Sequence, residues 1–431
     1  MAPARSSPAD AVLWQEQVDL PVLPTDAGAA DARVDVAIVG GGYAGLAAAR
    51  VLAGASRRVT VFEKGPLGWG AHSRNGGMVI PELKAGPASL RAKYGPLGLR
   101  MHHEVNEAFD HVEALIADES IACDYERTGQ LYLAHAPRLV PYLEGVAREH
   151  QELGEPVRFV PREALGEEIG SASWHGGVVF DRTGALQPAR FHAGLVRLAL
   201  EAGAVIRDRT AATGLTDRGA GHDGGRFLLE TEQGAVRADE VIVTTNAYAD
   251  RLLPELARRV LPIGSFIVAT EPLGAELADA VSPKRRMFVN TKNLLFYWRL
   301  SPDGRMVFGG RRSLQHATVA DAADYLISSM HEIHPQLRDV AVTHRWGGNV
   351  AVTLDRMPHV GRVRGAWYAT GCNGSGVALN TWLGHRLGQV VLGEAPPPSF
   401  AELRHRPIPL HRFRKLYLPL VGQWFRYQDR P

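Results

Sequence analysis

The stretch that most constrains the fold is residues 34–63, VDVAIVGGGYAGLAAARVLAGASRRVTVFE. It opens with an apolar run at 34–39, which is typical of a buried parallel strand. Three glycines follow with the spacing G-x-G-x-x-G, at Gly40, Gly42 and Gly45. An alanine-rich run then predicts a helix, and a second apolar run predicts a strand that ends on Glu63. This order of strand, turn, helix, strand and acid is the fingerprint of a dinucleotide-binding unit.

Each part of the fingerprint has a physical role. Gly40 permits the tight turn, Gly42 lets the backbone approach a pyrophosphate, and Gly45 lets the helix lie close to the strand. The helix N-terminus offers unpaired N–H groups to the phosphates. Glu63 stands where a carboxylate accepts hydrogen bonds from ribose hydroxyls, and its charge disfavours the 2′-phosphate of NADP. The fingerprint alone leaves NAD and FAD open, and an α/β turn without a ligand is the alternative.

Composition bounds the class of protein. A chain of 431 residues exceeds what one core usually holds, so two domains are expected. The formal net charge of +2 gives no reason to expect nucleic acid as a partner. Cys123 and Cys372 form no C-x-x-C or C-x4-C pair, which argues against a disulfide reductase. No secretory signal and no bilayer-spanning run is evident, so a cytoplasmic location is expected.

The rest of the chain alternates between two kinds of structure. Helical spacing of apolar residues predicts helices at 97–119, 137–151, 188–202 and 318–331, and a further helix follows the glycine loop at 371–376 and ends at about residue 392. Short apolar runs predict strands at 129–134, 204–206, 227–230, 235–237, 241–243 and 367–370. Further strands are predicted in quick succession at 264–269, 287–289, 294–300 and 306–308. A hairpin signal at 301–305 joins the last two, so a mostly antiparallel second domain is expected.

A glycine-rich loop follows the second strand of the fingerprint. It runs from 65 to 77 and leaves the edge of the sheet at which open α/β folds bind ligands. Its small residues let the backbone approach a flat ligand, and Arg74 can place a fixed positive charge beside that ligand. An ordinary surface loop with an ion-paired arginine is the alternative.

Five further stretches join the fingerprint in one resemblance. They are SRNGG at 73–77, TTNAY at 244–248, LLFYWRLSPDGRMVFGGRRS at 294–313, GCNGSGVALN at 371–380 and PLVGQWFRYQDR at 419–430. Together they resemble the D-amino-acid oxidase-like FAD oxidoreductases, and most closely their γ-glutamylputrescine oxidase-like branch. The resemblance extends from about residue 12 to the end of the chain.

The resemblance implies an α/β fold, in which a Rossmann-like FAD-binding domain carries an inserted, mostly antiparallel α+β substrate domain. The FAD-binding domain is expected to comprise 11–95, 156–250 and 346–400, and the substrate domain 96–155 and 251–345. Residues 1–10 are rich in proline, alanine and serine and are expected to be disordered. Residues 401–431 are expected to form a strap on the FAD-binding domain; a membrane-surface segment is the alternative, because they carry apolar and basic residues.

The chemistry is also implied by the resemblance. The carbon that bears the amine of an amine or amino acid passes a hydride to flavin N5, which gives an imine that water hydrolyses. O2 is the expected electron acceptor and would yield H2O2. A cysteine attaches the flavin in the sarcosine oxidase branch, and the matching stretch 347–352 has none, so non-covalent FAD is expected. Two lysines of that branch correspond to residues 377–379 and to Val307, which makes sarcosine a poor substrate.

The resemblance assigns contacts with FAD to the fingerprint and to both glycine loops. The residues are Gly40, Gly42, Tyr43, Ala44, Gly45, Glu63, Lys64, Ser73, Arg74, Asn75, Gly76, Gly77, Val205, Thr245, Asn246, Gly371, Asn373, Gly374, Ser375, Gly376 and Val377. Many members of the family have histidine in place of Ser375. In the last loop, the backbone amides of 374–377 are stronger candidates than the side chains of Asn373 and Ser375.

Four residues are candidates for the catalytic site: Arg74, Tyr297, Arg299 and Arg311. A positive group beside the flavin stabilises the anionic reduced ring, and Arg74 is the first candidate for this role and Arg311 the second. Tyr297 and Trp298 alternate along a strand, so only one faces the substrate, and the phenol is favoured because it can orient an amine. Arg299 shares the face of Tyr297 and is either a carboxylate clamp or a structural ion pair.

Other polar residues are weaker candidates. The segment 344–346, His-Arg-Trp, could flank the site, whereas His359 at a strand end is expected to be structural. No metal is expected, because His102, His103, Glu104 and Asp110 have no spacing that places metal ligands on one helix face.

Three other functions remain open from the sequence. A dehydrogenase of the same fold would pass electrons to a quinone or a carrier, and substrate would bleach its flavin under air with little peroxide. A non-redox flavin-binding subunit would hold FAD that no amine reduces. An NAD enzyme is less favoured, because nothing that resembles a nicotinamide pocket follows the fingerprint. The particular amine and the oligomeric state do not follow from the sequence.

Overall fold

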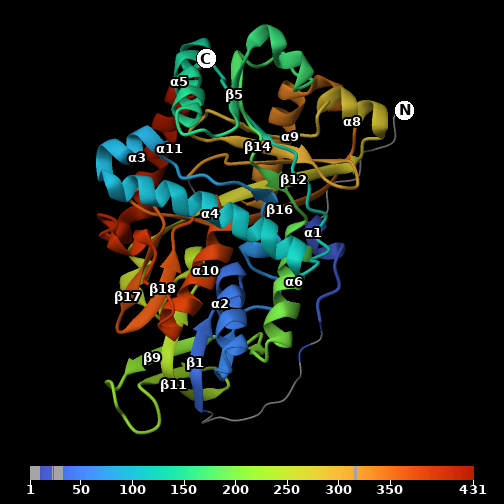
Figure 1. Cartoon of the computed structure of the whole chain (residues 1–431). Coiled ribbons are helices and arrows are strands. Elements are labelled where there is room, and N and C mark those ends of the chain that lie inside the picture. The colour runs from blue at the N-terminus through green and yellow to red at the C-terminus, as the bar shows by residue number, and fades with distance from the viewer. Residues whose placement is uncertain (1–9, 22, 24–32, 315–317) are drawn as a thin grey trace.

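The computed structural model describes residues 10–21, 23, 33–314 and 318–431. Figure 1 shows two sheets, one above the other, with the long helix α4 (Pro96–Asp118) crossing between them. The predicted disorder at 1–10 lies outside the described residues except at Asp10. No helix in the described part of the chain is both long and apolar enough to cross a membrane.

The first sheet is the Rossmann-like unit that the fingerprint predicts. β1 (Arg33–Val39) pairs in parallel with β2 (Val59–Phe62) and β11 (Gly234–Val243), in the order β17-β18-β11-β1-β2-β8. The outer strands are β8 (Val205–Arg207), β9 (Ala212–Asp217), β10 (Phe227–Thr231), β17 (His359–Val363) and β18 (Ala366–Thr370). Helices α2 (Tyr43–Gly54), α6 (Pro188–Glu201) and α10 (Gly376–Leu392) pack in its core together with α4.

The second sheet is mostly antiparallel, as predicted. Its order is β16-β12-β15-β14-β13-β4-β6-β5, and of the described pairs only β13 with β4 is parallel. The strands are β4 (Gln130–Leu133), β5 (Val157–Pro161), β6 (Gly176–Phe180), β12 (Leu261–Pro272), β13 (Met287–Asn290), β14 (Phe296–Leu300), β15 (Arg305–Gly310) and β16 (Val342–Val352). Helices α5 (Val140–Gln151), α8 (Ala275–Val281) and α9 (Val319–Ile333) contribute apolar side chains to its two faces.

Short elements complete the chain. Strands β3 (Met78–Val79) and β7 (Gly184–Ala185) form a separate antiparallel pair. The other helices are α1 (Leu13–Glu16), α3 (Pro87–Tyr94), α7 (Pro254–Ala257) and α11 (Arg414–Gln428).

Strand pairing corrects three boundaries of the predicted domains. β5 and β6 fall within the predicted FAD-binding segment 156–250, yet they join the second sheet through β4. α4 is predicted in the substrate domain, yet its buried residues Phe109 and Val112 lie in the core of the first sheet. β16 continues through the predicted boundary at 346. A short apolar run indicates that a strand forms, whereas contacts distant in sequence decide which sheet it joins. The division into two domains itself stays a prediction.

The C-terminal segment also differs from the expected strap. Its first part does lie against α4, where Arg100 Nη2 donates to Glu402 Oε1 at 2.6 Å. α11, however, is tied to the second sheet, because Asp429 accepts hydrogen bonds from the amides of Asn293, at 2.7 Å, and Leu294, at 3.0 Å. Pro419 lies inside α11 and does not end it, although proline removes one helical hydrogen bond.

The N-terminal segment lies between the second sheet and α6. Trp14 has no exposed surface, and its ring meets that of Trp346 edge-on with 6.2 Å between centroids. Its indole Nε1 donates a hydrogen bond of 3.0 Å to the carbonyl oxygen of Asn75. The cluster around it also contains Ala189 of α6 and Val307 of β15. Trp14 therefore joins parts of the chain that are far apart in sequence.

Replacing Trp14 with alanine is expected to lower the free energy of unfolding by about 3 to 5 kcal/mol, because it leaves a cavity at this junction. Trp424→Ala is the matched control, since Trp424 is 56% exposed, and it should change the free energy of unfolding by less than about 0.5 kcal/mol. Urea denaturation followed by far-ultraviolet circular dichroism measures both. Equal losses in the two variants would contradict the buried position of Trp14.

Candidate functional site

A cavity of about 1570 Å³ is lined by residues from both sheets. The first sheet contributes the turn after β1, Glu63 at the end of β2, and residues 243–249 after β11. The second sheet contributes residues of β12, β14 and β16, and α11 closes part of the wall. The cavity thus lies at the strand ends where a ligand of the first sheet is expected.

The fingerprint turn needs its glycines. Gly40 has a φ of +108°, which favours glycine. A Cβ at position 45 would lie 1.9 Å from the Gly40 carbonyl oxygen, so the helix could not approach the turn with a larger residue there. The Glu63 carboxylate accepts hydrogen bonds from the amides of Gly41, at 2.8 Å, and Gly65, at 2.9 Å, which hold it beside the turn.

These residues fit the adenosine diphosphate part of a dinucleotide. The N-cap of α2 is Gly42, so no side chain caps the helix, and its first N–H groups remain available for phosphates. Gly42 and Glu63 both line the cavity. Each carboxylate oxygen of Glu63 has a further lone pair that can accept a ribose hydroxyl.

The loop at 73–77 is held by its carbonyl groups. The four carbonyl oxygens of residues 74–77 each accept a hydrogen bond from a distant donor, over 2.7 to 3.0 Å. In order along the loop, the donors are the Trp346 indole, the Trp14 indole, the Arg299 guanidinium and the Leu186 amide. The backbone amides of Asn75 and Gly76 have no partner in the described chain, and both residues line the cavity. The loop is therefore held through its carbonyl oxygens, and the backbone amides of Asn75 and Gly76 remain available to donate to a ligand.

Arg299 is not placed to clamp a substrate. It is 3% exposed and is not among the residues that line the cavity. Its guanidinium donates to the carbonyl oxygens of Gly76 at 2.7 Å, Leu186 at 2.6 Å and Leu300 at 3.2 Å. Burial lowers the pKa of Arg299 to about 10. The expectation of a carboxylate clamp is corrected accordingly, because backbone carbonyls occupy these donors.

Tyr297 and Trp298 lie on opposite faces of β14. Tyr297 lines the cavity, and its hydroxyl is 3.1 Å from Ser265 Oγ. Trp298 is fully buried and stacks on Phe288 in the core of the second sheet. A Cβ at Gly76 would lie 3.0 Å from the Tyr297 ring, which places the phenol against the loop at 73–77.

Arg74 and Arg311, which both line the cavity, differ in their contacts. Arg74 donates from Nε to the Trp69 carbonyl oxygen at 2.6 Å and from Nη1 to that of Gly347 at 3.2 Å. Arg311 makes no hydrogen bond or ion pair with any described residue, and its Nε is buried without a partner. Burial lowers the pKa of both guanidinium groups, yet arginine keeps its charge. Arg311 is therefore a cation without a counterpart among the residues that the structure describes.

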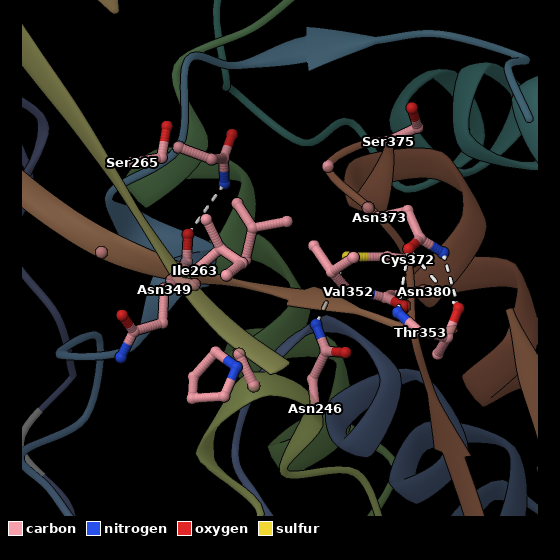
Figure 2. Close-up of a pocket in the computed structure, with 18 of the residues that line it drawn as sticks. Asn246, Ile263, Ser265, Asn349, Val352, Thr353, Cys372, Asn373, Ser375 and Asn380 are labelled. Atoms are coloured by element: carbon pink, nitrogen blue, oxygen red, sulfur yellow. Dashed lines mark hydrogen bonds between the residues drawn. The ribbon is translucent and has the colours of Figure 1, made fainter. Parts of the chain in front are cut away.

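Side-chain amides shape the last glycine loop, as Figure 2 shows. Asn246 accepts from the Gly371 amide at 3.0 Å and donates to Cys372 Sγ at 3.3 Å. Asn373 donates to the Gly371 carbonyl oxygen at 2.5 Å and accepts from the Thr353 amide at 3.2 Å. The side chain of Asn373 thus holds the loop, which favours the backbone amides of 374–377 as ligand donors.

Most of the predicted cofactor residues line the cavity. These are Gly40, Gly42, Tyr43, Ala44, Glu63, Lys64, Arg74, Asn75, Gly76, Thr245, Asn246, Asn373, Gly374, Ser375, Gly376 and Val377. Those that do not line it are Gly45, Ser73, Gly77, Val205 and Gly371. Val205 is 49% exposed on the edge strand β8, and Ala212 of β9 lines the cavity instead. Nothing in the sequence marks Ala212 as a cavity residue.

The cavity also has polar lining residues that were not expected, among them His72 and Lys84. His72 lies against Gly42 and stacks on His192 at 4.0 Å, and burial lowers the pKa of both rings, so both are neutral near pH 7. Lys84 Nζ donates to Ser375 Oγ at 3.3 Å. His72 directly precedes SRNGG, so its position in the sequence could have indicated a place in the site. Nothing in the sequence marks Lys84 in this way.

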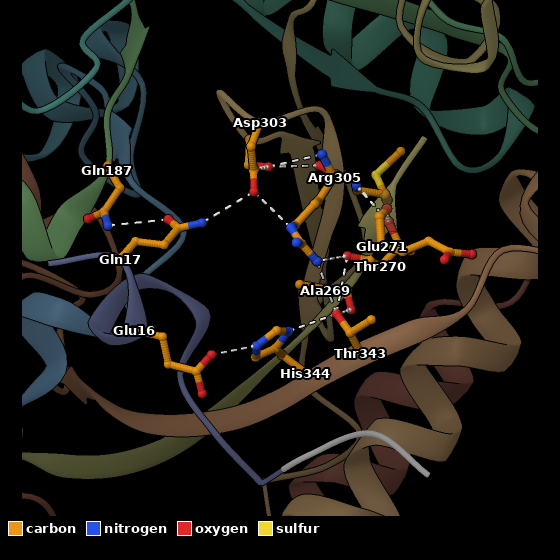
Figure 3. Close-up of polar contacts among 12 residues, drawn as sticks. Glu16, Gln17, Gln187, Ala269, Thr270, Glu271, Asp303, Arg305, Thr343 and His344 are labelled. Carbon is orange, nitrogen blue, oxygen red and sulfur yellow. Dashed lines mark hydrogen bonds and ion pairs between the residues drawn. The ribbon is translucent and has the colours of Figure 1, made fainter. Parts of the chain in front are cut away.

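None of residues 344–346 and His359 lines the cavity. Their contacts are instead with other parts of the protein. Figure 3 shows His344 facing Glu16 of α1, at 3.0 Å, in a network that also joins Gln17 to Asp303 at 3.2 Å. Trp346 donates to the loop at 73–77. His359, expected to be structural, is buried 3.0 Å from Asp355.

The chain is similar to several known proteins over most of its length. Residues 35–390 match the protein family described as FAD dependent oxidoreductase. The chain is 31% identical over 427 residues to a probable oxidoreductase, OrdL, of Rhizobium meliloti (strain 1021), with 97% of each chain covered. It is 29% identical over 402 residues to the gamma-glutamylputrescine oxidoreductase of Escherichia coli (strain K12), with 92% of this chain and 93% of the other covered. A solved glycine oxidase from Geobacillus kaustophilus has a TM-score of 0.73 at 22% identity, over 87% of this chain and 100% of the other.

Gly42→Val is expected to weaken FAD binding by at least about tenfold, because the new side chain occupies the space through which the pyrophosphate approaches the backbone. A Cβ at position 42 would also lie 3.2 Å from His72 Nδ1, so the double variant with His72→Ala removes that contact within the protein. Gly54→Ala in the same helix is the control, since a Cβ there meets nothing within 4 Å.

Flavin content after purification and a fluorescence titration with FAD measure these effects. The double variant should remain deficient and the control should bind normally. Full flavin retention by Gly42→Val would contradict a pyrophosphate site at this turn.

Proposed function

Since the chain belongs to the family of FAD-dependent oxidoreductases, we propose that it oxidises the carbon–nitrogen bond of an amine or amino acid and passes the electrons to O2. The names of two relatives support this substrate class, because one is a gamma-glutamylputrescine oxidoreductase and others are glycine oxidases. The arrangement of the cavity supports it independently.

Arg311 carries the proposal. Its guanidinium lacks a partner in the described chain, and the residue lines the cavity. Tyr297 and Gly374 line the cavity as well, and a Cβ at Gly374 would lie 3.9 Å from Arg311 Nη2. A buried cation without a counterpart favours an anionic ligand. We assign this role to the carboxylate of the substrate, which brings the neighbouring amine-bearing carbon against the last glycine loop.

The cofactor would be held by backbone groups from both glycine loops and by Glu63. The amides of Asn75 and Gly76 and those of residues 374–377 are the donors available for its flavin end. Bound FAD supplies a hydride acceptor, which protein side chains cannot provide. With no cysteine in residues 347–352, the proposed attachment is non-covalent.

Tyr297 and Arg74 have separate roles in the proposal. The Tyr297 hydroxyl, which lies beside Ser265 Oγ, can accept a hydrogen bond from the substrate amine and orient it. Arg74 keeps its charge at the cavity wall while two carbonyl groups fix its position. A fixed cation there stabilises negative charge that develops during flavin reduction and oxygen reduction.

An anaerobic spectral titration tests the function. The purified protein with FAD is mixed with polyamines, γ-glutamylated diamines, D- and L-amino acids and N-methyl amino acids, and its flavin bands are followed. Bleaching by one of these classes supports the proposal and identifies the substrate class. Peroxide after air is admitted supports an oxidase, whereas bleaching that persists in air favours the dehydrogenase. Flavin bands that no compound bleaches would contradict the proposed activity.

Arg311→Met is expected to raise the KM for a substrate that carries a carboxylate by roughly 30-fold or more, the effect of removing one partner of a buried charge pair. Arg312→Met is the control, because Arg312 is exposed and contacts the carbonyl oxygen of Asp321. Both variants should retain FAD. An equal rise in KM for amines with and without a carboxylate would contradict the assignment of Arg311.

A further inference from the structure

Helix α11 has two apolar faces. Tyr417, Leu418, Val421 and Phe425 face inward and line the cavity. On the outer side, five large apolar residues are 41% to 72% exposed: Phe413, Leu416, Leu420, Trp424 and Tyr427. Their spacing of three or four residues places them along one side of the helix. The inward face explains how α11 packs, whereas the side chains of the outer face are exposed.

The outer face is larger than an isolated exposed side chain. Trp424 and Tyr427 stack with 5.8 Å between ring centroids, and Leu410, just before the helix, is 69% exposed. Contiguous exposed apolar surface of this kind marks an interaction site in soluble domains. Tryptophan and tyrosine have an apolar body and a polar tip, which suits a boundary between water and a nonpolar phase.

The charged residues around this face are mostly basic. Residues 404–430 contain seven Lys or Arg residues and a single acid, Asp429, although the whole chain is nearly balanced with 48 basic and 46 acidic residues. Asp429 is already bound to the amides of Asn293 and Leu294. Arg412 and Lys415 are exposed and form no ion pair with any described carboxylate.

We propose that the outer face of α11 docks on the surface of an anionic lipid bilayer. The apolar stripe enters the boundary between headgroups and acyl chains, and the flanking cations bind lipid phosphates. A second copy of the chain fits less well, because the same basic residues would face each other across a twofold interface. The inner face of α11 lines the cavity, so the docked protein would hold one wall of its proposed active site against the membrane.

Co-sedimentation of the full-length, FAD-loaded protein with lipid vesicles tests this proposal without any turnover. Wild type is expected to bind vesicles of phosphatidylcholine that contain phosphatidylglycerol, and to bind pure phosphatidylcholine much less. Binding should weaken at about 1 M NaCl, where the Debye length falls to about 3 Å. Failure of the amine titration would leave this result unaffected, because binding to lipid needs no substrate.

The double variant L420S/W424S should bind the anionic vesicles at least about tenfold more weakly, because it removes apolar surface from the stripe. Leu153→Ser is the matched control, since Leu153 is 46% exposed on a different element. Flavin content confirms that each variant folds. The proposal is overturned if wild type ignores anionic vesicles, or if L420S/W424S binds them as wild type does. It is also overturned if sedimentation velocity shows a wild-type dimer that L420S/W424S loses and neither protein binds vesicles.

Discussion

The buried guanidinium of Arg299 is the contact on which the cavity depends. It extends from β14 of the second sheet to the carbonyl oxygens of Gly76 and Leu186, and so joins the loop at 73–77 to the start of α6. No carboxylate accepts from it, and three carbonyl dipoles compensate its charge. Removing any part of this network would leave a charge or a carbonyl buried without a partner, which is costly. The two sheets are therefore fixed relative to each other where the cavity lies.

Three arginines near the cavity differ in what the protein leaves for a ligand. Arg299 has all of its contacts within the protein, and Arg74 shares its guanidinium with two carbonyl groups. Arg311 has none among the described residues. These different contacts could not be predicted from the sequence, because the residues beside each arginine do not show which acceptors the fold brings to it. The hydrogen bonds of each arginine therefore distinguish Arg299 and Arg74, which contact the protein, from Arg311, the proposed substrate contact.

The sequence predicted best where the signal is local. The fingerprint needs only consecutive residues, and a Cβ at Gly45 would collide with Gly40 five residues earlier. Alternation along β14 correctly predicted that Tyr297 and Trp298 separate, but not that Arg299 turns toward carbonyl groups from Gly76 and Leu186. The sheet that β5 and β6 join depends on the pairing of β6 with β4, and the side of the molecule that α11 covers depends on partners more than a hundred residues away. Such pairing leaves no periodic pattern in the chain.

The contacts of Arg299 and Trp14 also explain why Val307 stands where the resemblance places a lysine of the sarcosine oxidase branch. Val307 lies directly opposite Arg299 in the pairing of β14 with β15, and it is buried in the cluster around Trp14. A lysine there would set a second cation opposite the first and away from water, and both effects are unfavourable. Because Arg299 holds the loop and Trp14 covers this position, a cation at position 307 is disfavoured, and the cavity has arginines at the loop and at the end of β15 instead. Arg74 and Arg311 occupy those two positions.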